Sequence, residues 1–131
     1  MALILIIEDN ELNRTLVSRR LSKRGFEVVE VCDAEQGKAE IARQKPDLIV
    51  MDLGLPGVDG WELTRRLKAS PETFEIPILV LTAYARSADS KQALDAGCDA
   101  FETKPLNFES FLSKIHKLLS DRAVGLPEAR S

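Results

Sequence analysis

Short apolar runs alternate with longer, more polar stretches along the 131 residues of the chain. The runs are rich in Ile, Val and Leu, long enough for a β-strand and too short for most helices. They cover Ala2–Ile7, Phe26–Val31, Asp47–Met51, Ile78–Leu81 and, more weakly, Cys98–Glu102. The stretches between them have helical spacing, and such alternation is typical of a parallel sheet covered on both faces. We therefore predict a single doubly wound α/β domain with the architecture (βα)5.

Residues that begin and end helices support this alternation. Polar side chains able to accept hydrogen bonds from the free amides of a first helical turn stand at the predicted helix starts. These candidate caps are Asn10, Asp33 with Gln36, Asp59 with Glu62, Ser87 and Asn107. Gly25 and Gly97 follow predicted helix ends, where a left-handed residue is common.

An apolar stripe with helical spacing predicts the last helix over Phe108–Leu119. After Ser120 the sequence DRAVGLPEARS loses this periodicity and contains a glycine and a proline. We expect residues 1–120 to form the domain and residues 121–131 to be a flexible tail or the stub of a linker.

The composition limits the possible functions. A 44% hydrophobic content is enough for one core, and a formal net charge of −3 argues against a nucleic-acid partner, because contact with phosphate backbones needs a basic face. The apolar opening run ends at Glu8 and Asp9, well short of the ~20 residues of a membrane span, and lacks the basic leader of a signal peptide. We expect a cytoplasmic protein with no membrane anchor.

The two cysteines, Cys32 and Cys98, have neither CxxC spacing nor the density of a disulfide scaffold. We interpret both as reduced thiols that pack as small buried hydrophobic residues.

Polar side chains follow the predicted strands at the ends where loops lead into helices. They are Glu8 and Asp9 after the first strand, Asp52 after the third, Thr82 after the fourth, and Lys104 with Pro105 after the fifth. Functional groups gather at the carboxyl ends of parallel strands, so three carboxylates converge if the first and third strands are neighbours. Each pair of like charges about 4 Å apart costs about 4 kcal/mol at an effective dielectric constant of about 20.

Positive charge must offset this repulsion. Lys104 supplies one charge, and a divalent metal is the natural source of the rest. Oxygen ligands suit Mg²⁺ or Mn²⁺ rather than zinc, and protein-bound Mg²⁺ usually keeps waters and a phosphate oxygen as further ligands. The site therefore indicates phosphoryl chemistry, in which Asp52 forms an acyl phosphate. The metal, Lys104 and the Thr82 hydroxyl would each meet one phosphoryl oxygen.

Four segments, in this order, resemble the response-regulator receiver domains of two-component systems and phosphorelays. They are IIEDN with its acidic pair, DLIVMDLGLPGVDG at the end of the third strand, LVLTAY with its Thr-Ala pair, and FETKP with its Lys-Pro pair. The resemblance covers roughly Leu3–Leu119 and implies a flavodoxin-like sheet in the strand order 2-1-3-4-5. The EDNELN segment is more similar to receivers of hybrid kinases and stand-alone regulators than to those joined to DNA-binding domains.

The resemblance also implies a role for the acidic residues. Asp52 would be the phosphoacceptor, Asp9 a direct Mg²⁺ ligand and Glu8 a ligand acting largely through water. The backbone carbonyl of Gly54 would complete the protein's share of the metal ligands. A protein of this kind catalyses only its own phosphorylation and dephosphorylation and is not a turnover enzyme.

Further residues would connect phosphorylation to a distant surface. Lys104 would form an ion pair at the site, and its bond to Pro105 would be cis. Thr82 would move toward the new oxygens, and Phe101 on the fifth strand would follow it inward. Phosphorylation would thus shift an existing two-state equilibrium.

The implied partners are proteins. A histidine kinase or a histidine phosphotransfer protein would dock on the first helix near Leu12, Asn13 and Leu16. A downstream protein would contact the surface formed by the fourth helix, the fifth strand and the fifth helix. The resemblance leaves open whether the chain is a monomer or a weak homodimer.

Three other functions would fit the same fold class. A phosphatase with an aspartyl nucleophile carries a DxD pattern after its first strand, which EDNE does not supply, and a flavin-binding protein of this fold class needs a Ser-, Thr- or Gly-rich phosphate loop there. A binding module that keeps the fold without being phosphorylated is opposed by the full set of residues but stays open.

Overall fold

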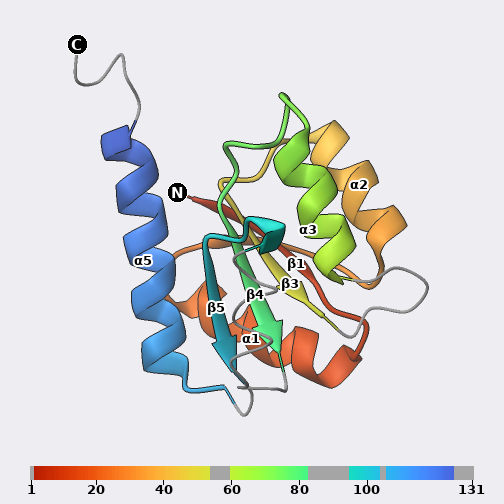
Figure 1. Cartoon of the computed structure of the whole chain (residues 1–131). Coiled ribbons are helices and arrows are strands. Elements are labelled where there is room, and N and C mark those ends of the chain that lie inside the picture. Colours follow the sequence, from red (N-terminus) through yellow and green to blue (C-terminus); the bar gives the residue numbers. More distant parts are fainter. Residues whose placement is uncertain (1, 54–59, 83–94, 104–105, 126–131) are drawn as a thin grey trace.

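Five parallel strands form one sheet in the order β2-β1-β3-β4-β5, which confirms the predicted fold class and strand order. Figure 1 shows the computed structural model, which describes residues 2–53, 60–82, 95–103 and 106–125. In chain order the elements are β1 (Leu3–Ile7), α1 (Glu11–Lys23), β2 (Glu27–Val31), α2 (Ala34–Arg43), β3 (Leu48–Asp52), α3 (Gly60–Ala69), β4 (Ile78–Thr82), β5 (Ala100–Thr103) and α5 (Phe108–Gly125). All five residues of β1, β3 and β4 are buried.

Alternate residues of the central strands face opposite sides of the sheet, and helices cover both sides. Met51 belongs to the core beneath α2 and α3, together with Trp61. Val50, its neighbour on β3, belongs to the core beneath α1 and α5, together with Phe111. Figure 1 shows α2 and α3 next to each other on one side of the sheet and α5 on the other. Burial on both faces is the reason why these strands are continuous apolar runs instead of alternating patterns.

Three predicted N-caps on described residues, Asn10, Asp33 and Asn107, are confirmed. The side chain of Asn10 accepts a hydrogen bond from the amide of Asn13 (2.9 Å), and that of Asn107 accepts one from Ser110 (3.1 Å). Gly25 and Gly97 have φ angles of 92° and 89°, as expected for residues that end helices. Asp59 and most of the predicted fourth helix, including its cap Ser87, lie outside the described residues.

The start of α2 differs from the expected reciprocal capping box. Asp33 accepts a hydrogen bond from the amide of Gln36 (2.8 Å), as predicted. The side chain of Gln36, however, accepts a hydrogen bond from the amide of Cys32 (3.1 Å) rather than from that of Asp33. The long amide side chain therefore ties the first turn of α2 to the end of β2.

α5 is longer than the apolar stripe predicted. It continues to Gly125, six residues past the predicted end at Leu119. An ion pair between Lys117 and Asp121 (3.1 Å) joins the predicted part of the helix to this extension. Loss of the apolar stripe therefore does not end the helix. Neither α5 nor any other helix in the described part of the chain has the length and apolar character to cross a membrane.

The start of β5 and the burial of the cysteines differ from the expectations. β5 begins at Ala100 rather than at Cys98. The carboxylate of Asp99, just before the strand, accepts a hydrogen bond from the amide of Ile78 (2.8 Å) and pairs with Lys68 (2.7 Å). Cys32 and Cys98 are free thiols, as expected, but both are only partly buried.

Candidate metal centre

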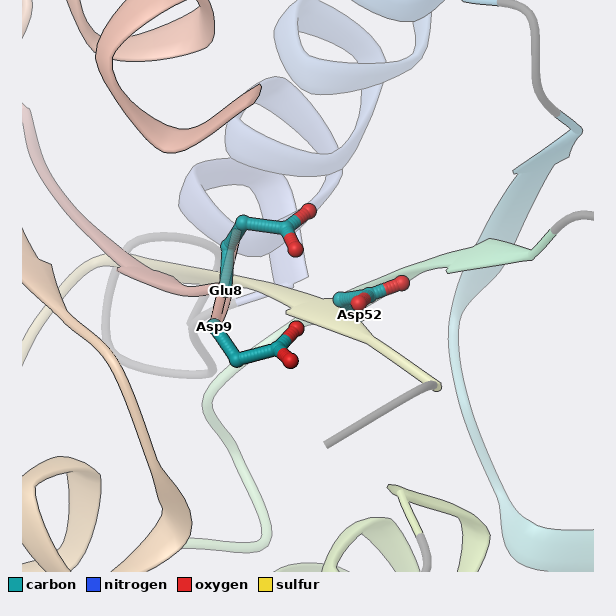
Figure 2. Close-up of side chains that lie close together, drawn as sticks. All are labelled: Glu8, Asp9 and Asp52. Atoms are coloured by element: carbon teal, nitrogen blue, oxygen red, sulfur yellow. The ribbon is translucent and has the colours of Figure 1, made fainter. Parts of the chain in front are cut away.

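Three carboxylates converge at the carboxyl ends of two neighbouring strands. Glu8 and Asp9 directly follow β1, and Asp52 is the last residue of β3. The two strands pair up to Ile7 and Met51, which brings Glu8 level with Asp52. One oxygen of each carboxylate lies within 4.8 Å of the others. Figure 2 shows the side chains of Glu8 and Asp9 directed to the side on which Asp52 lies.

Local hydrogen bonds fix the acidic turn between β1 and α1. The carboxylate of Glu8 accepts a hydrogen bond from the amide of Asn10 (3.1 Å), the same residue that caps α1. The backbone oxygen of Glu8 accepts a hydrogen bond from the guanidinium group of Arg14 (2.9 Å). The start of α1 thus positions one of the three carboxylates.

The burial of the three acids is unequal. Glu8 and Asp52 are 3% and 6% exposed, whereas Asp9 is exposed. Carboxylates this close repel one another by about 3 to 4 kcal/mol per pair at an effective dielectric constant of about 20. A hard divalent cation relieves this repulsion. Opposite ligands of octahedral Mg²⁺ are about 4.2 Å apart, so these three oxygens fit such an ion with small side-chain movements or a bridging water.

Thr82 and Phe101 lie on the same face of the sheet. Asp52 pairs with Leu81 across β3 and β4, so Thr82 is one residue beyond the level of Asp52, and it is buried. On β5, Phe101 pairs with Val80 and the following residues pair up to Thr82. Because side chains alternate along a strand, Phe101 and Thr82 are diagonal neighbours. Thr82 and Phe101, the two residues predicted to move together, are therefore neighbours on one face of the sheet.

Of the predicted site residues, the structure brings together Glu8, Asp9 and Asp52, with Thr82 on the adjacent strand. Gly54, Lys104 and Pro105 lie outside the described residues, so their predicted roles are not tested by the structure.

α3 begins directly against the backbone of the site, a feature that the sequence reasoning missed. A Cβ atom added to Gly60 would lie 2.9 Å from Cα of Leu53 and 3.2 Å from the backbone oxygen of Asp52. Only a glycine fits there without displacing the chain next to the acidic cluster. The sequence shows this glycine at the helix start but carries no signal for the close approach.

A buried polar cluster between β5 and α5 was also missed. Glu102 is 7% exposed. Its carboxylate accepts hydrogen bonds from Lys114 Nζ (2.8 Å) and the hydroxyl of Ser110 (3.2 Å), and Lys114 also donates to the backbone oxygen of Phe101 (2.8 Å). A glutamate within an apolar strand pattern, followed by a lysine on the next helix, was the available signal. This cluster adjoins the predicted switch residue.

Comparison with known proteins identifies the family. The family model of the response regulator receiver domain matches residues 4–116. The chain belongs to the response regulator receiver family. This receiver is 34% identical over 118 residues to the polar-differentiation response regulator DivK of Brucella anthropi, covering 90% of this chain and 96% of DivK.

Longer and experimentally solved relatives also match. The receiver is 39% identical over 129 residues to RpaA of Synechocystis sp., a DNA-binding dual master transcriptional regulator; the match covers 98% of this chain but 53% of RpaA, so this chain spans about half of that relative. The crystal structure of the receiver domain of sensor histidine kinase PA1611 from Pseudomonas aeruginosa PAO1 has a TM-score of 0.82 at 32% identity and covers 91% of this chain and 98% of that domain. That structure has a magnesium ion coordinated in its active site cleft.

These relatives agree with the resemblance seen in the sequence. DivK and the PA1611 receiver are of the stand-alone and kinase-linked kinds that EDNELN predicted, although RpaA is a DNA-binding regulator. A receiver domain is a signalling module phosphorylated on an aspartate with magnesium, not a turnover enzyme.

Proposed function

We propose that this receiver accepts a phosphoryl group on Asp52 from a phosphorylated histidine, beside a Mg²⁺ ion held by Glu8, Asp9 and Asp52. The observation that carries the proposal is the meeting of three carboxylate oxygens within 4.8 Å at the ends of β1 and β3. The magnesium site of the PA1611 receiver supports Mg²⁺ as the ion. Mn²⁺ has the same ligand preference and would replace it.

The proposed transfer needs little covalent work from the protein. An oxygen of Asp52 attacks phosphorus as the bond from phosphorus to the histidine nitrogen breaks, and that nitrogen keeps the electron pair. Bound Mg²⁺ would neutralise charge on a phosphoryl oxygen. The Thr82 hydroxyl would donate a hydrogen bond to a second oxygen and Lys104 would pair with a third. The carbonyl of Gly54 would serve as a further metal ligand, and the Lys104–Pro105 bond would be cis.

Output would begin at Thr82 and Phe101. Their positions on one face of adjacent strands support a coupled movement, in which Thr82 approaches the phosphoryl group and Phe101 follows. The altered surface would include the fourth helix, β5 and α5, where a downstream protein binds. The receiver would act in the cytoplasm as a monomer or weak homodimer, with residues 1–120 as the signalling domain and the last residues as a tail or linker stub.

The donor would be a histidine kinase or a histidine phosphotransfer protein that docks on α1. Leu12 and Leu16 support this docking surface, because they are 75% and 53% exposed although both are large and apolar. A hollow of about 300 Å³ is lined by Leu16 and Arg20 of α1 and by Glu8, so it reaches one acid of the cluster.

The test is incubation with acetyl phosphate and Mg²⁺, followed by mass measurement of the intact protein. We expect a gain of one phosphoryl group that is absent without Mg²⁺ and absent in Asp52→Asn. No gain in a folded wild-type chain would identify a binding module that is not phosphorylated. Continuous release of phosphate from simple monoesters would instead identify an enzyme.

A further inference from the structure

One exposed ridge along α1 is apolar at its start and positively charged at its end. Residues four apart on a helix lie on one side of it, and Leu12, Leu16, Arg20 and Arg24 follow this spacing. The first two are exposed leucines, and Leu16 lines the hollow that reaches Glu8. The last two are exposed arginines: Arg20 also lines this hollow, and Arg24 is the C-cap of the helix. The ridge is about 18 Å long, so it runs from an apolar end beside the acidic cluster to a cationic end at the C-cap of the helix.

Both arginines of the cationic end contact an aromatic ring. The guanidinium carbons of Arg20 and Arg24 lie 5.1 Å and 5.4 Å from the ring centroid of Phe108, the first residue of α5. With Lys23 these residues line a second hollow of about 350 Å³. Contact with the ring limits the freedom of both arginines, so less side-chain entropy is lost when they bind an anionic group.

These cations have no acidic partner in the described part of the chain. None of the ion pairs formed among those residues includes Arg20, Lys23 or Arg24, whereas Arg14, on the same helix, pairs with Glu30. These three cations, which have no ion-pair partner among the described residues, form a local positive patch on a chain of net charge −3. A patch of this size fits carboxylates on a protein better than a nucleic acid, which would require a broad basic face.

We infer that this ridge binds a helix of the histidine-bearing partner that carries apolar side chains near its histidine and carboxylates about two turns away. The inference rests on the proposed function and adds the chemistry of the partner to it. The leucines provide apolar contact area close to the site of transfer. The arginines and Lys23 attract the acidic end, set the direction in which the partner helix lies, and discourage partners with a basic end.

The test uses purified, phosphorylated histidine phosphotransfer domains as probes. One group carries carboxylates two turns from the histidine, and the other carries lysine or arginine there. Transfer rates are measured at low and high salt for the wild-type receiver, for Arg20→Gln/Arg24→Gln, and for Lys38→Gln/Lys45→Gln. The last variant, called the α2 variant, makes the same change in net charge at Lys38 on α2 and at Lys45 two residues after it, beside the opposite face of the sheet. Arg20→Lys/Arg24→Lys keeps the charge while removing the guanidinium groups from Phe108.

We expect acidic donors to transfer at least about tenfold faster than basic donors at low salt, with a smaller difference at high salt. Arg20→Gln/Arg24→Gln should lose this advantage, and the α2 variant and the lysine variant should keep it. Acetyl phosphate should label the wild-type receiver and the three double variants equally. Equal rates for the two donor groups, an advantage that persists in the glutamine variant, or no transfer from any acidic donor would overturn the inference. Failure of acetyl phosphate to label the wild type is a separate outcome that removes the proposed function itself.

Discussion

Lys114 of α5 donates a 2.8 Å hydrogen bond to the backbone oxygen of Phe101 on β5 while pairing with the buried carboxylate of Glu102. One side chain therefore joins the helix to the strand at the residue predicted to move with Thr82. The side chain of Lys114 is 39% exposed and that of Glu102 only 8%. Water can solvate the ammonium group if the ion pair breaks, whereas the buried carboxylate would be left without compensation for its charge.

Replacing Lys114 by methionine should destabilise the domain by about 1 to 3 kcal/mol, because a buried carboxylate loses its cationic partner. Urea unfolding measures the change. Lys117→Met is the matched control on the same helix: its ion pair with Asp121 has side chains 75% and 63% exposed, and its loss should cost less than about 1 kcal/mol. Equal effects of the two variants would show that the Glu102 cluster contributes little.

Alanine at Gly60 should be much more harmful than alanine at Gly37. A Cβ at Gly60 meets the backbone of Leu53 next to the acidic cluster, so we expect a loss of about 1 to 3 kcal/mol and slower labelling by acetyl phosphate. A Cβ at Gly37 meets Cδ1 of Ile7 at 2.8 Å, the end of a side chain that can rotate. Better helix propensity offsets part of that cost by up to about 1 kcal/mol. A chemical unfolding curve for each variant tests this, and a Gly60→Ala chain as stable and as active as wild type would contradict it.

Removal of single carboxylates should weaken Mg²⁺ binding unequally. Asp9→Asn should raise the dissociation constant by about tenfold or more, since Asp9 is exposed and free to approach the ion. Glu8→Gln should have a smaller effect, because that side chain already accepts a hydrogen bond from Asn10. Trp61, the only tryptophan, follows Gly60 in the first turn of α3 and offers a fluorescence signal for the titration. A larger effect of Glu8→Gln would reverse the assigned roles.

Cys98 should react slowly with alkylating reagents near neutral pH. Burial, and secondarily the negative charge of Asp99, raises the pKa of the Cys98 thiol to about 11. At pH 8 only about one thiol in a thousand is then the reactive thiolate. In a Cys32→Ser chain, the rate of alkylation by iodoacetamide should rise about tenfold per pH unit up to pH of about 10. A rate that levels off between a pH of about 9 and about 10 would mean that the thiol has an ordinary pKa.

The sequence predicted most of the fold because the central strands β1, β3 and β4 are buried on both faces. Such strands are recognisable without tertiary information, and the residues after them identify the site once the order of a parallel sheet is known. Asn10, Asp33 and Asn107 act as caps for the local reason that their side chains accept hydrogen bonds from nearby amides. Apolar runs and the polar residues after them were therefore enough to predict both the architecture and the acidic cluster.

What the sequence did not predict depends on contacts between distant segments. The tight approach of Gly60 to Leu53 and the pairing of Glu102 with Lys114 require knowledge of how a helix lies against the sheet. The end of α5 at Gly125 was missed for a different reason: the apolar stripe reports packing, whereas helical backbone continues as long as the residues tolerate it.

The central claim is that Asp52 itself receives the phosphoryl group. Borohydride reduces an aspartyl phosphate to homoserine and leaves a free carboxylate unchanged, so peptide mass analysis after treatment with acetyl phosphate, Mg²⁺ and borohydride identifies the modified position. We predict homoserine at position 52 only, and none when Mg²⁺ is withheld. Homoserine at Asp9 or at another aspartate, or an unmodified position 52 in a chain that has gained a phosphoryl group, would contradict the account.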